Sequence, residues 1–171
     1  MNASDILKYG HGTVLQTIDG LAEPAWEMSG ACGVWSVKDI IAHLASYELV
    51  LKEVLSSFQG DSAMPSSSPG GSATPTLNAF VDPGGHFNDA QVALRKDSSP
   101  ANVLAEYTSV HDQVVALAAQ IPAETCRKAG TLPWYGEEYA LDDFIVYAFY
   151  GHKREHCAQI ALFRDRERSQ Q

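Results

Sequence analysis

Hydrophobic residues recur at intervals of three and four along most of this chain, which is the spacing of amphipathic helices. The first such segment runs from about Ser4 to Leu21 and ends before Pro24. The second begins at Ser36, which can cap a helix, and Asp39 three residues later resembles a capping box. The inward positions of this second helix are Ile40, His43, Leu44, Tyr47, Leu51 and Val54.

Two further long helices are predicted in the second half of the chain. One begins at Ser99, with Pro100 at its first helical position, and ends at Pro122. The other spans about Leu141 to Arg166, with acidic residues in its first turn and arginines in its last, as the helix dipole favours. Its inward positions are Phe144, Ile145, Ala148, Phe149, His152, His156, Ile160 and Phe163, and its solvated face is expected to carry Lys153, Arg154 and Gln159.

The segments between these helices are of three kinds. Residues Gly60–Thr76 are rich in Ser, Pro and Gly, which predicts a flexible loop, either a binding loop or a surface insertion. Residues Phe87–Asp97 predict a short helix, and Gly130–Ala140 looks extended, as a turn or small hairpin. Four long amphipathic helices with little strand pattern predict an all-α fold, a four-helix bundle with long loops.

Composition narrows the class of protein. A length of 171 residues predicts a single domain, spanning 1–171, that is large enough to bury a core without metal or disulfides. The net charge of −9 argues against nucleic acid as a partner, because a phosphate-binding protein needs a basic face. No stretch predicts a membrane span or a signal peptide. The cysteines Cys32, Cys126 and Cys157 form no CxxC motif and predict reduced thiols in a cytoplasmic protein.

Histidines supply the candidate chemistry. His152 and His156 are four residues apart, so a helix places both rings on one face, and His43 lies in the apolar stripe of another helix. Each alone could be a core residue with a hydrogen-bond partner, because a buried imidazole needs one. Together they favour a three-histidine site for a divalent cation such as Zn²⁺, Ni²⁺ or Fe²⁺, with open positions for water or a thiolate.

Other residues are weaker candidates for the chemistry. His11 and His111 fall singly on apolar stripes, which favours a structural or pocket-lining place, and His86 is expected in an exposed loop. Cys157 is interpreted as a small buried hydrophobic residue. Tyr47 could hold water or substrate or simply pack, and Asp39 could orient His43. Glu48 and Glu155 are candidates for a general base, but helical phase places both on the flank of their helices.

The sequence resembles the DinB/YfiT-like four-helix bundle superfamily in three stretches. "WSVKDIIAHLASYE" resembles the second helix of that family, with a metal-ligand histidine at His43. "FNDAQVALRKDSSPANVLAEYTSVHDQVV" resembles the segment leading into its third helix, and "YGHKREHCAQI" resembles its HxxxH motif at His152 and His156. The resemblance implies a divalent metal held by these three histidines.

The same resemblance indicates a range of activities. Branches of the superfamily include bacillithiol- and mycothiol-dependent transferases and isomerases, and "WSVKDIIAHL" is similar to cyclopropane hydrolases that confer self-resistance to a genotoxin. A metal-dependent enzyme acting on a small electrophile, by S-transfer, isomerisation or hydrolysis, is therefore expected, with a low-molecular-weight thiol as a candidate cofactor. The alternatives are a non-catalytic bundle that binds metal or a small ligand, and a structural bundle. The resemblance also implies a homodimer.

Overall fold

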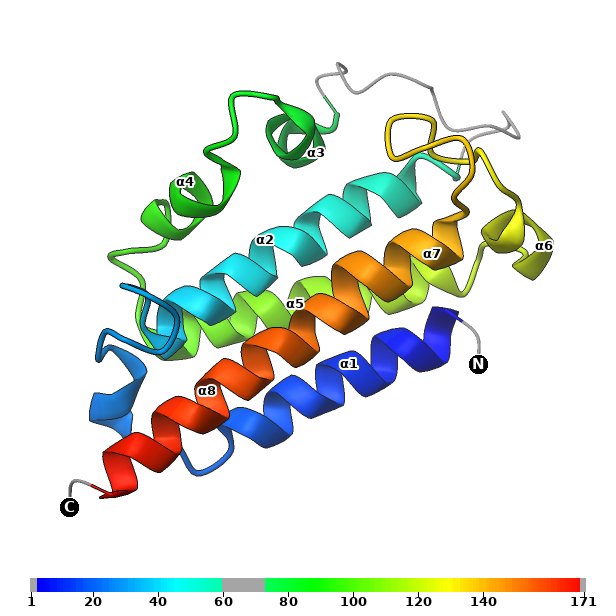
Figure 1. The fold of residues 1–171 in the computed structure, drawn as a ribbon. Helices are drawn as coiled ribbons and strands as arrows, with labels where there is room; N and C mark the ends of the chain where they lie inside the picture. Colours follow the sequence, from blue (N-terminus) through cyan, green and yellow to red (C-terminus); the bar gives the residue numbers. More distant parts are fainter. Residues whose placement is uncertain (1–2, 60–72, 170–171) are drawn as a thin grey trace.

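The computed structural model describes residues 3–59 and 73–169, and its long helices form the predicted bundle (Figure 1). Helix α1 covers Ala3–Ile18, α2 covers Val37–Ser56 and α5 covers Pro100–Ala118. The last long helix consists of α7 (Leu141–Ile145), the π-helical segment η2 (Val146–Gly151) and α8 (His152–Ser169). Over the described residues, extended pairing amounts to one isolated bridge between Cys32 and Trp35. The all-α prediction is confirmed.

The long helices are arranged as two parallel pairs that run in opposite directions. Helix α2 packs along α5, and α1 packs along α8 (Figure 1). Because α2 and α5 run in the same direction, the chain must cross back between them. Two short helices on this crossover, α3 (Pro75–Val81) and α4 (Phe87–Ala93), lie against α2. Of the predicted loop Gly60–Thr76, residues 60–72 lie outside the described residues, and α3 begins at Pro75.

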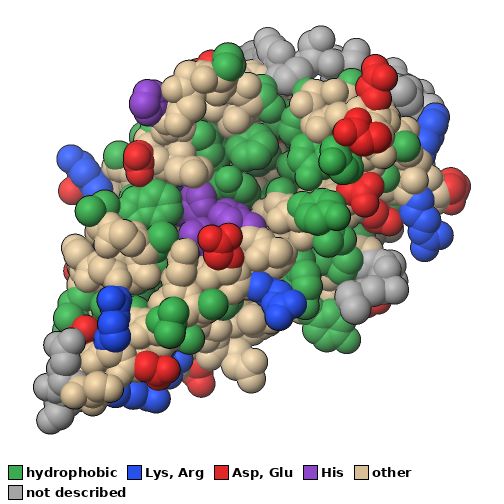
Figure 2. Space-filling view, in the orientation of Figure 1, with side chains coloured by type: hydrophobic (Ala, Val, Ile, Leu, Met, Phe, Trp, Pro, Cys, Tyr) green, Lys and Arg blue, Asp and Glu red, His purple; other side chains and the backbone are tan. Residues whose placement is uncertain are grey.

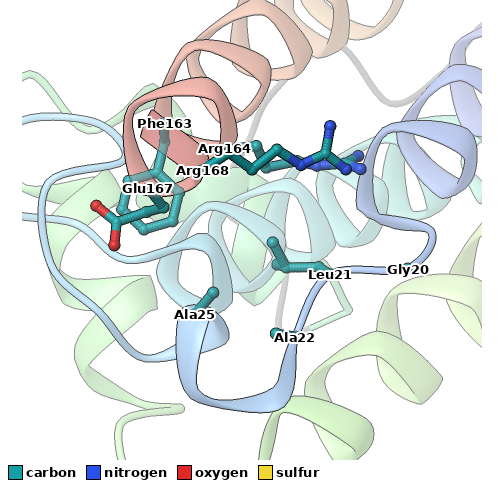
Figure 3. Close-up of a pocket in the computed structure, with 8 residues that line it drawn as sticks. All are labelled: Gly20, Leu21, Ala22, Ala25, Phe163, Arg164, Glu167 and Arg168. Carbon is teal, nitrogen blue, oxygen red and sulfur yellow. The ribbon is translucent and has the colours of Figure 1, made fainter. Parts of the chain in front are cut away.

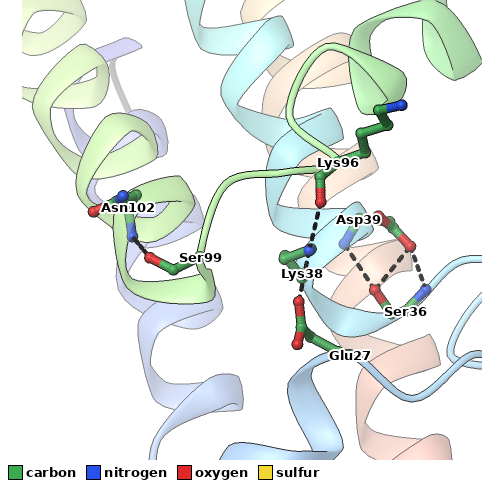
Figure 4. A network of polar contacts seen from close by, with 7 residues as sticks. All are labelled: Glu27, Ser36, Lys38, Asp39, Lys96, Ser99 and Asn102. Atoms are coloured by element: carbon green, nitrogen blue, oxygen red, sulfur yellow. Dashed lines mark hydrogen bonds and ion pairs between the residues drawn. The ribbon is translucent and has the colours of Figure 1, made fainter.

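Side-chain caps begin α2 and α5 as the sequence predicts (Figure 4). Ser36 Oγ accepts from Asp39 N at 3.2 Å, and an Asp39 carboxylate oxygen accepts from Ser36 N at 2.9 Å. These two bonds satisfy amides that the first turn of a helix leaves without partners. At α5, Ser99 Oγ accepts from Asn102 N at 3.2 Å, and Pro100 follows the cap. Both caps therefore place the helix starts as predicted.

Apolar side chains between the helices bury two connected groups, one toward each end of the bundle. One group includes Leu51, Phe144 and Phe149, and the other includes Ile40 and Phe163, each at most 1% exposed. These residues lie on the stripes that the sequence pattern selects. Burial of a large apolar side chain stabilises a fold by roughly 1.5–3 kcal/mol, so these stripes account for helix packing without a metal.

Several short elements differ from the sequence prediction. The helices η1 (Glu23–Trp26) and α6 (Ala123–Arg127) have too few residues to show a periodic pattern and were not predicted. The segment 130–140, predicted as extended or a small hairpin, consists of turns. Gly130 and Gly136 there have φ of 76° and 142°, a backbone region that glycine tolerates and other residues avoid. Turns at these two glycines therefore connect α6 to α7 without a strand.

The predicted helix from about Leu141 to Arg166 is interrupted rather than uniform. Residues Val146–Gly151 are π-helical, with a wider turn than the α-helix on either side. Such a turn inserts a residue and changes the phase of everything that follows it. Phe144 before this segment and His156 after it are both buried, so the inserted residue keeps both halves of the helix facing the core. Across residues 3–59 and 73–169, no helix combines the length and apolar character that crossing a membrane requires.

Candidate metal centre

The structure brings together the three histidines that the sequence pattern selects. His43 extends from the middle of α2, and His152 and His156 extend from the first two turns of α8. The Nε2 atom of His152 lies 2.9 Å from that of His43 and 2.9 Å from that of His156. All three candidate ligand atoms lie within 4.8 Å of one another. Figure 2 shows histidine side chains near the middle of one face, set among hydrophobic side chains.

Burial keeps these imidazoles neutral. His43 and His156 are 2% and 6% exposed, and His152 is half-buried. Loss of solvation, followed by the proximity of His152 and His156, lowers the pKa of His43 to about 3. Loss of solvation and then His156 lower the pKa of His152 to about 4, and burial lowers that of His156. At neutral pH the cluster therefore presents neutral imidazole rings, the form in which histidine binds a metal.

A hydrogen bond from outside the cluster sets the orientation of His156. The Nδ1 atom of His156 lies 2.8 Å from Gln159 Oε1. An amide oxygen only accepts, so Nδ1 carries the proton and the lone pair of Nε2 faces His152. This is the arrangement by which outer residues orient metal-ligating histidines.

The hydrogen-bond geometry of the cluster fits a bound cation. One neutral ring nitrogen carries either a hydrogen or a lone pair, so His152 Nε2 can make only one linear hydrogen bond to its two neighbours. Without an ion, at least one of the two close Nε2 pairs, His43–His152 or His152–His156, therefore has no hydrogen bond between its nitrogens. A zinc ion with Zn–N bonds of roughly 2.0–2.1 Å keeps tetrahedral ligands roughly 3.3–3.4 Å apart. That value lies between the 2.9 Å of the two close pairs and the 4.8 Å within which all three atoms lie. The donor set suits a divalent metal, and small rotations of the rings would bring the three nitrogens to the tetrahedral spacing.

Comparison with known proteins agrees with this geometry. A profile of the DinB superfamily matches residues 7–160. The chain belongs to the DinB superfamily. No curated protein and no solved structure gives a significant match to the chain. The DinB match and the three-histidine cluster together support a metal-binding DinB-like protein.

Aromatic side chains border the histidine cluster of this DinB protein. The Tyr47 ring lies 4.4 Å from the ring of His152 and 4.8 Å from that of His43. Tyr47 in turn meets Phe80 of α3 and Phe87 of α4, with centroids 5.4 and 5.9 Å apart, and Trp35 lies 5.0 Å from His43. We call Trp35, Tyr47, Phe80 and Phe87 the aromatic wall; all four are half-buried. Burial raises the pKa of Tyr47, so its hydroxyl stays protonated at neutral pH.

The weaker candidates from the sequence occupy other places. Asp39 serves the helix cap, and among the described residues the Nδ1 atom of His43 has no hydrogen-bond partner, so Asp39 does not orient it. Glu155 is exposed, as is His86. Cys157 is buried, and burial raises the pKa of its thiol, which agrees with its interpretation as a small hydrophobic residue.

Two charged residues were assigned to the wrong environment by sequence reasoning. Lys153 was placed on the solvated face and Glu48 on the flank, yet they are 1% and 0% exposed. They form a buried ion pair with each other, and Glu48 Oε1 also lies 3.4 Å from Nδ1 of His111. His111 stacks on His11 with ring centroids 3.9 Å apart. The helical spacing of Lys153 from buried Ile160, one heptad away, was the signal available in the sequence.

A hollow at the other end of α8 is separate from the histidine cluster (Figure 3). It has a volume of about 170 Å³, and Phe163, Leu21 and Ala25 are among its lining residues. The side chains of Arg164 and Arg168 extend to one side of it and Glu167 to the other. The Arg164 guanidinium donates to the carbonyl of Thr17 and so caps the end of α1. None of the three histidines lines this hollow.

Proposed function

We propose that this DinB protein is a divalent-metal-dependent enzyme that acts on a small electrophilic molecule. The observation that carries the proposal is the convergence of Nε2 atoms from His43, His152 and His156, held neutral by burial. Three imidazoles leave coordination positions open, which is typical of catalytic rather than structural sites. We propose these histidines as the ligands, with zinc, nickel and iron as the candidate metals.

The residues of the chain have distinct parts in this proposal. A divalent cation with open positions lowers the pKa of bound water or holds a thiolate, and it polarises an electrophile. Gln159 holds the Nδ1 proton of His156 and so directs its Nε2 lone pair inward. The protonated Tyr47 hydroxyl can donate a hydrogen bond to a substrate beside His152. The aromatic wall limits access of water and favours a substrate with an apolar body.

Two reaction types share this site and differ in the nucleophile. Water leads to hydrolysis, and a low-molecular-weight thiol leads to S-transfer or isomerisation. The test incubates metal-replete protein with a small electrophile, with and without a low-molecular-weight thiol, and His156→Ala serves as the inactive reference. Turnover only with thiol supports transfer, and turnover without thiol supports hydrolysis. If metal binds and neither reaction exceeds the His156→Ala reference, the non-catalytic binding function is favoured instead.

We further propose a homodimer, as the family resemblance implies, and a cytoplasmic location, as the three cysteines without a CxxC motif indicate. Half-buried aromatic side chains such as Tyr135 and Tyr150 can contribute to a subunit contact. Light scattering at micromolar concentration should give twice the mass of 18.5 kDa, and the mass of a single chain would contradict the dimer.

A further inference from the structure

A polar cluster lies buried where the four long helices meet. Glu48 of α2 pairs with Lys153 of α8, and its Oε1 atom also lies 3.4 Å from Nδ1 of His111 on α5. His11 of α1 stacks on His111, and Lys153 Nζ lies 5.6 Å from the centre of the Tyr107 ring. Burial alone raises the pKa of Glu48, but Lys153 and His111 outweigh it and lower the pKa, so the carboxylate is ionised. The centre of the bundle therefore contains a full ion pair.

This ion pair is a poor means of stabilising the fold. Moving two charges out of water costs several kcal/mol each, and apolar residues of similar volume often stabilise a fold as well or better. The cluster also leaves buried polar atoms without hydrogen-bond partners among the described residues, namely Glu48 Oε2, Tyr107 Oη and His11 Nδ1. The contribution of the ion pair to stability therefore does not explain why these two charges are buried. The position of the pair between α2 and α8 is a better explanation.

The geometry connects the two helices that carry the candidate metal ligands. Helix α2 packs mainly against α5 and α8 mainly against α1, and α2 meets α8 over only a short length. Apolar side chains such as Ile40 and Phe163 pack these two helices together but do not fix their register. Two polar links join the helices as well, namely the histidine cluster and the ion pair. Lys153 directly follows His152, and Glu48 lies five residues after His43, roughly 7.5 Å along the helix axis.

We propose that Glu48 and Lys153 are positioning residues for the histidine cluster. Their ion pair fixes the rotation and register of α2 against α8, and so holds His43 opposite His152 and His156 before a metal binds. Three neutral imidazoles cannot do this by themselves, because they share at most one linear hydrogen bond. The inference rests on the proposed metal site and adds two residues that do not touch the metal.

The test separates register from stability with matched variants. Glu48→Gln and Lys153→Met each leave one buried charge without its partner, and the double variant removes both charges at similar volume. The control is Glu27→Gln with Lys38→Met, because Lys38 of α2 is also a buried lysine, 8% exposed, and it pairs with Glu27 at 2.7 Å (Figure 4). That control pair does not involve α8. Each protein is measured for metal-free melting temperature, Co²⁺ affinity and the visible spectrum of bound Co²⁺.

We expect both single variants to melt at lower temperature and to bind Co²⁺ more weakly. The double variant should regain the melting temperature of the wild type but remain at least roughly tenfold weaker in Co²⁺ affinity, with a changed spectrum. The control should keep the affinity and spectrum of the wild type. A double variant with wild-type affinity and spectrum would overturn the inference, as would one that still melts far below the wild type. Wild-type protein that binds no Co²⁺ would instead contradict the proposed function, and the inference with it.

Discussion

The Nδ1 atom of His156 donates a hydrogen bond to Gln159 Oε1 over 2.8 Å, one turn away on the same helix. This bond fixes which nitrogen of the ring carries the proton, and it leaves the Nε2 lone pair facing His152 at 2.9 Å. Gln159 was expected on the solvated face of the helix. Its side chain is instead partly buried, and it contacts His156. Gln159, which is not itself a candidate ligand, thus orients the ring of the candidate ligand His156.

Replacing Gln159 with Ala should weaken metal binding. Without the acceptor, the proton of His156 can occupy either nitrogen and the ring can rotate, so the ligand is less well oriented. Loss of such a partner typically costs roughly 10–100-fold in affinity. Competition titration with a chromophoric chelator measures the change. Gln113→Ala is the matched control, because Gln113 donates to the carbonyl of Ser109 on the exposed face of α5. Equal affinities for Gln159→Ala and wild type would contradict the orienting role.

Removing the metal should leave the fold intact. Residues such as Leu51, Phe144 and Phe163 are at most 1% exposed and pack without any contribution from an ion. Chelation should lower the melting temperature only by mass action, which is worth about 2.7 kcal/mol at a metal concentration 100 times Kd. The far-ultraviolet circular dichroism should not change at room temperature. Cooperative unfolding on addition of chelator at that temperature would assign the site a structural role.

Acid should destabilise the metal-free protein from about pH 6.5 downward. The pKa of His11 is lowered from 6.5 to about 4 by burial, followed by the nearby His111 and Lys153. In this range the unfolded chain binds protons that the folded chain does not, so the free energy of unfolding falls as pH falls. His43 and His152, with pKa values of about 3 and 4, act in the same direction.

The contribution of His11 can be isolated by substitution. Denaturant unfolding of the metal-free protein between pH 7 and pH 4 should show a shallower pH dependence for His11→Phe than for the wild type. Phenylalanine keeps a flat ring beside Tyr107 and His111 but has no titrating nitrogen. His86→Asn is the control, since His86 is exposed. If His11→Phe and wild type lose stability equally as pH falls, the titration of His11 does not contribute to acid destabilisation.

Replacing Ser36 with Ala should destabilise the start of α2. The change removes the acceptor for Asp39 N and leaves one amide of the first turn without its partner. Loss of such a cap typically costs about 0.5–2 kcal/mol in the free energy of unfolding. Ser99→Ala at the start of α5 removes the equivalent bond, so it should cost a similar amount. Denaturant unfolding measures both, and a neutral Ser36→Ala variant would refute the importance of the cap.

Local signals in the sequence were sufficient for the long helices and for the histidine cluster. The caps at Ser36 and Ser99 and the apolar spacing around His43 depend on residues within a turn or two of one another. His152 and His156 share one face of α8, because a spacing of four defines a face whatever precedes it. The π-helical segment before them has no comparable signal, because its extra residue is accommodated by packing against other helices.

The buried ion pair was missed for a different reason. Helical phase placed Glu48 on the flank of α2, although it lies four residues after Leu44 and three before Leu51, both of which are buried. Lysine and glutamate are rarely buried unless paired, so neither residue type indicates a buried position by itself. Each charge is acceptable inside only because the other is there. The partners are 105 residues apart in sequence, and only the tertiary fold brings them together.

The most direct test of the central claim is X-ray absorption spectroscopy of zinc-loaded protein prepared without an affinity tag. The wild type should bind one zinc per chain with three imidazole nitrogens at roughly 2.0–2.1 Å. His156→Ala should lose that signal while its fold loses only roughly 0.5–3 kcal/mol, the usual range for a point substitution. A wild type that binds no zinc, or a His156→Ala variant that keeps a full equivalent at unchanged affinity, would contradict the three-histidine site.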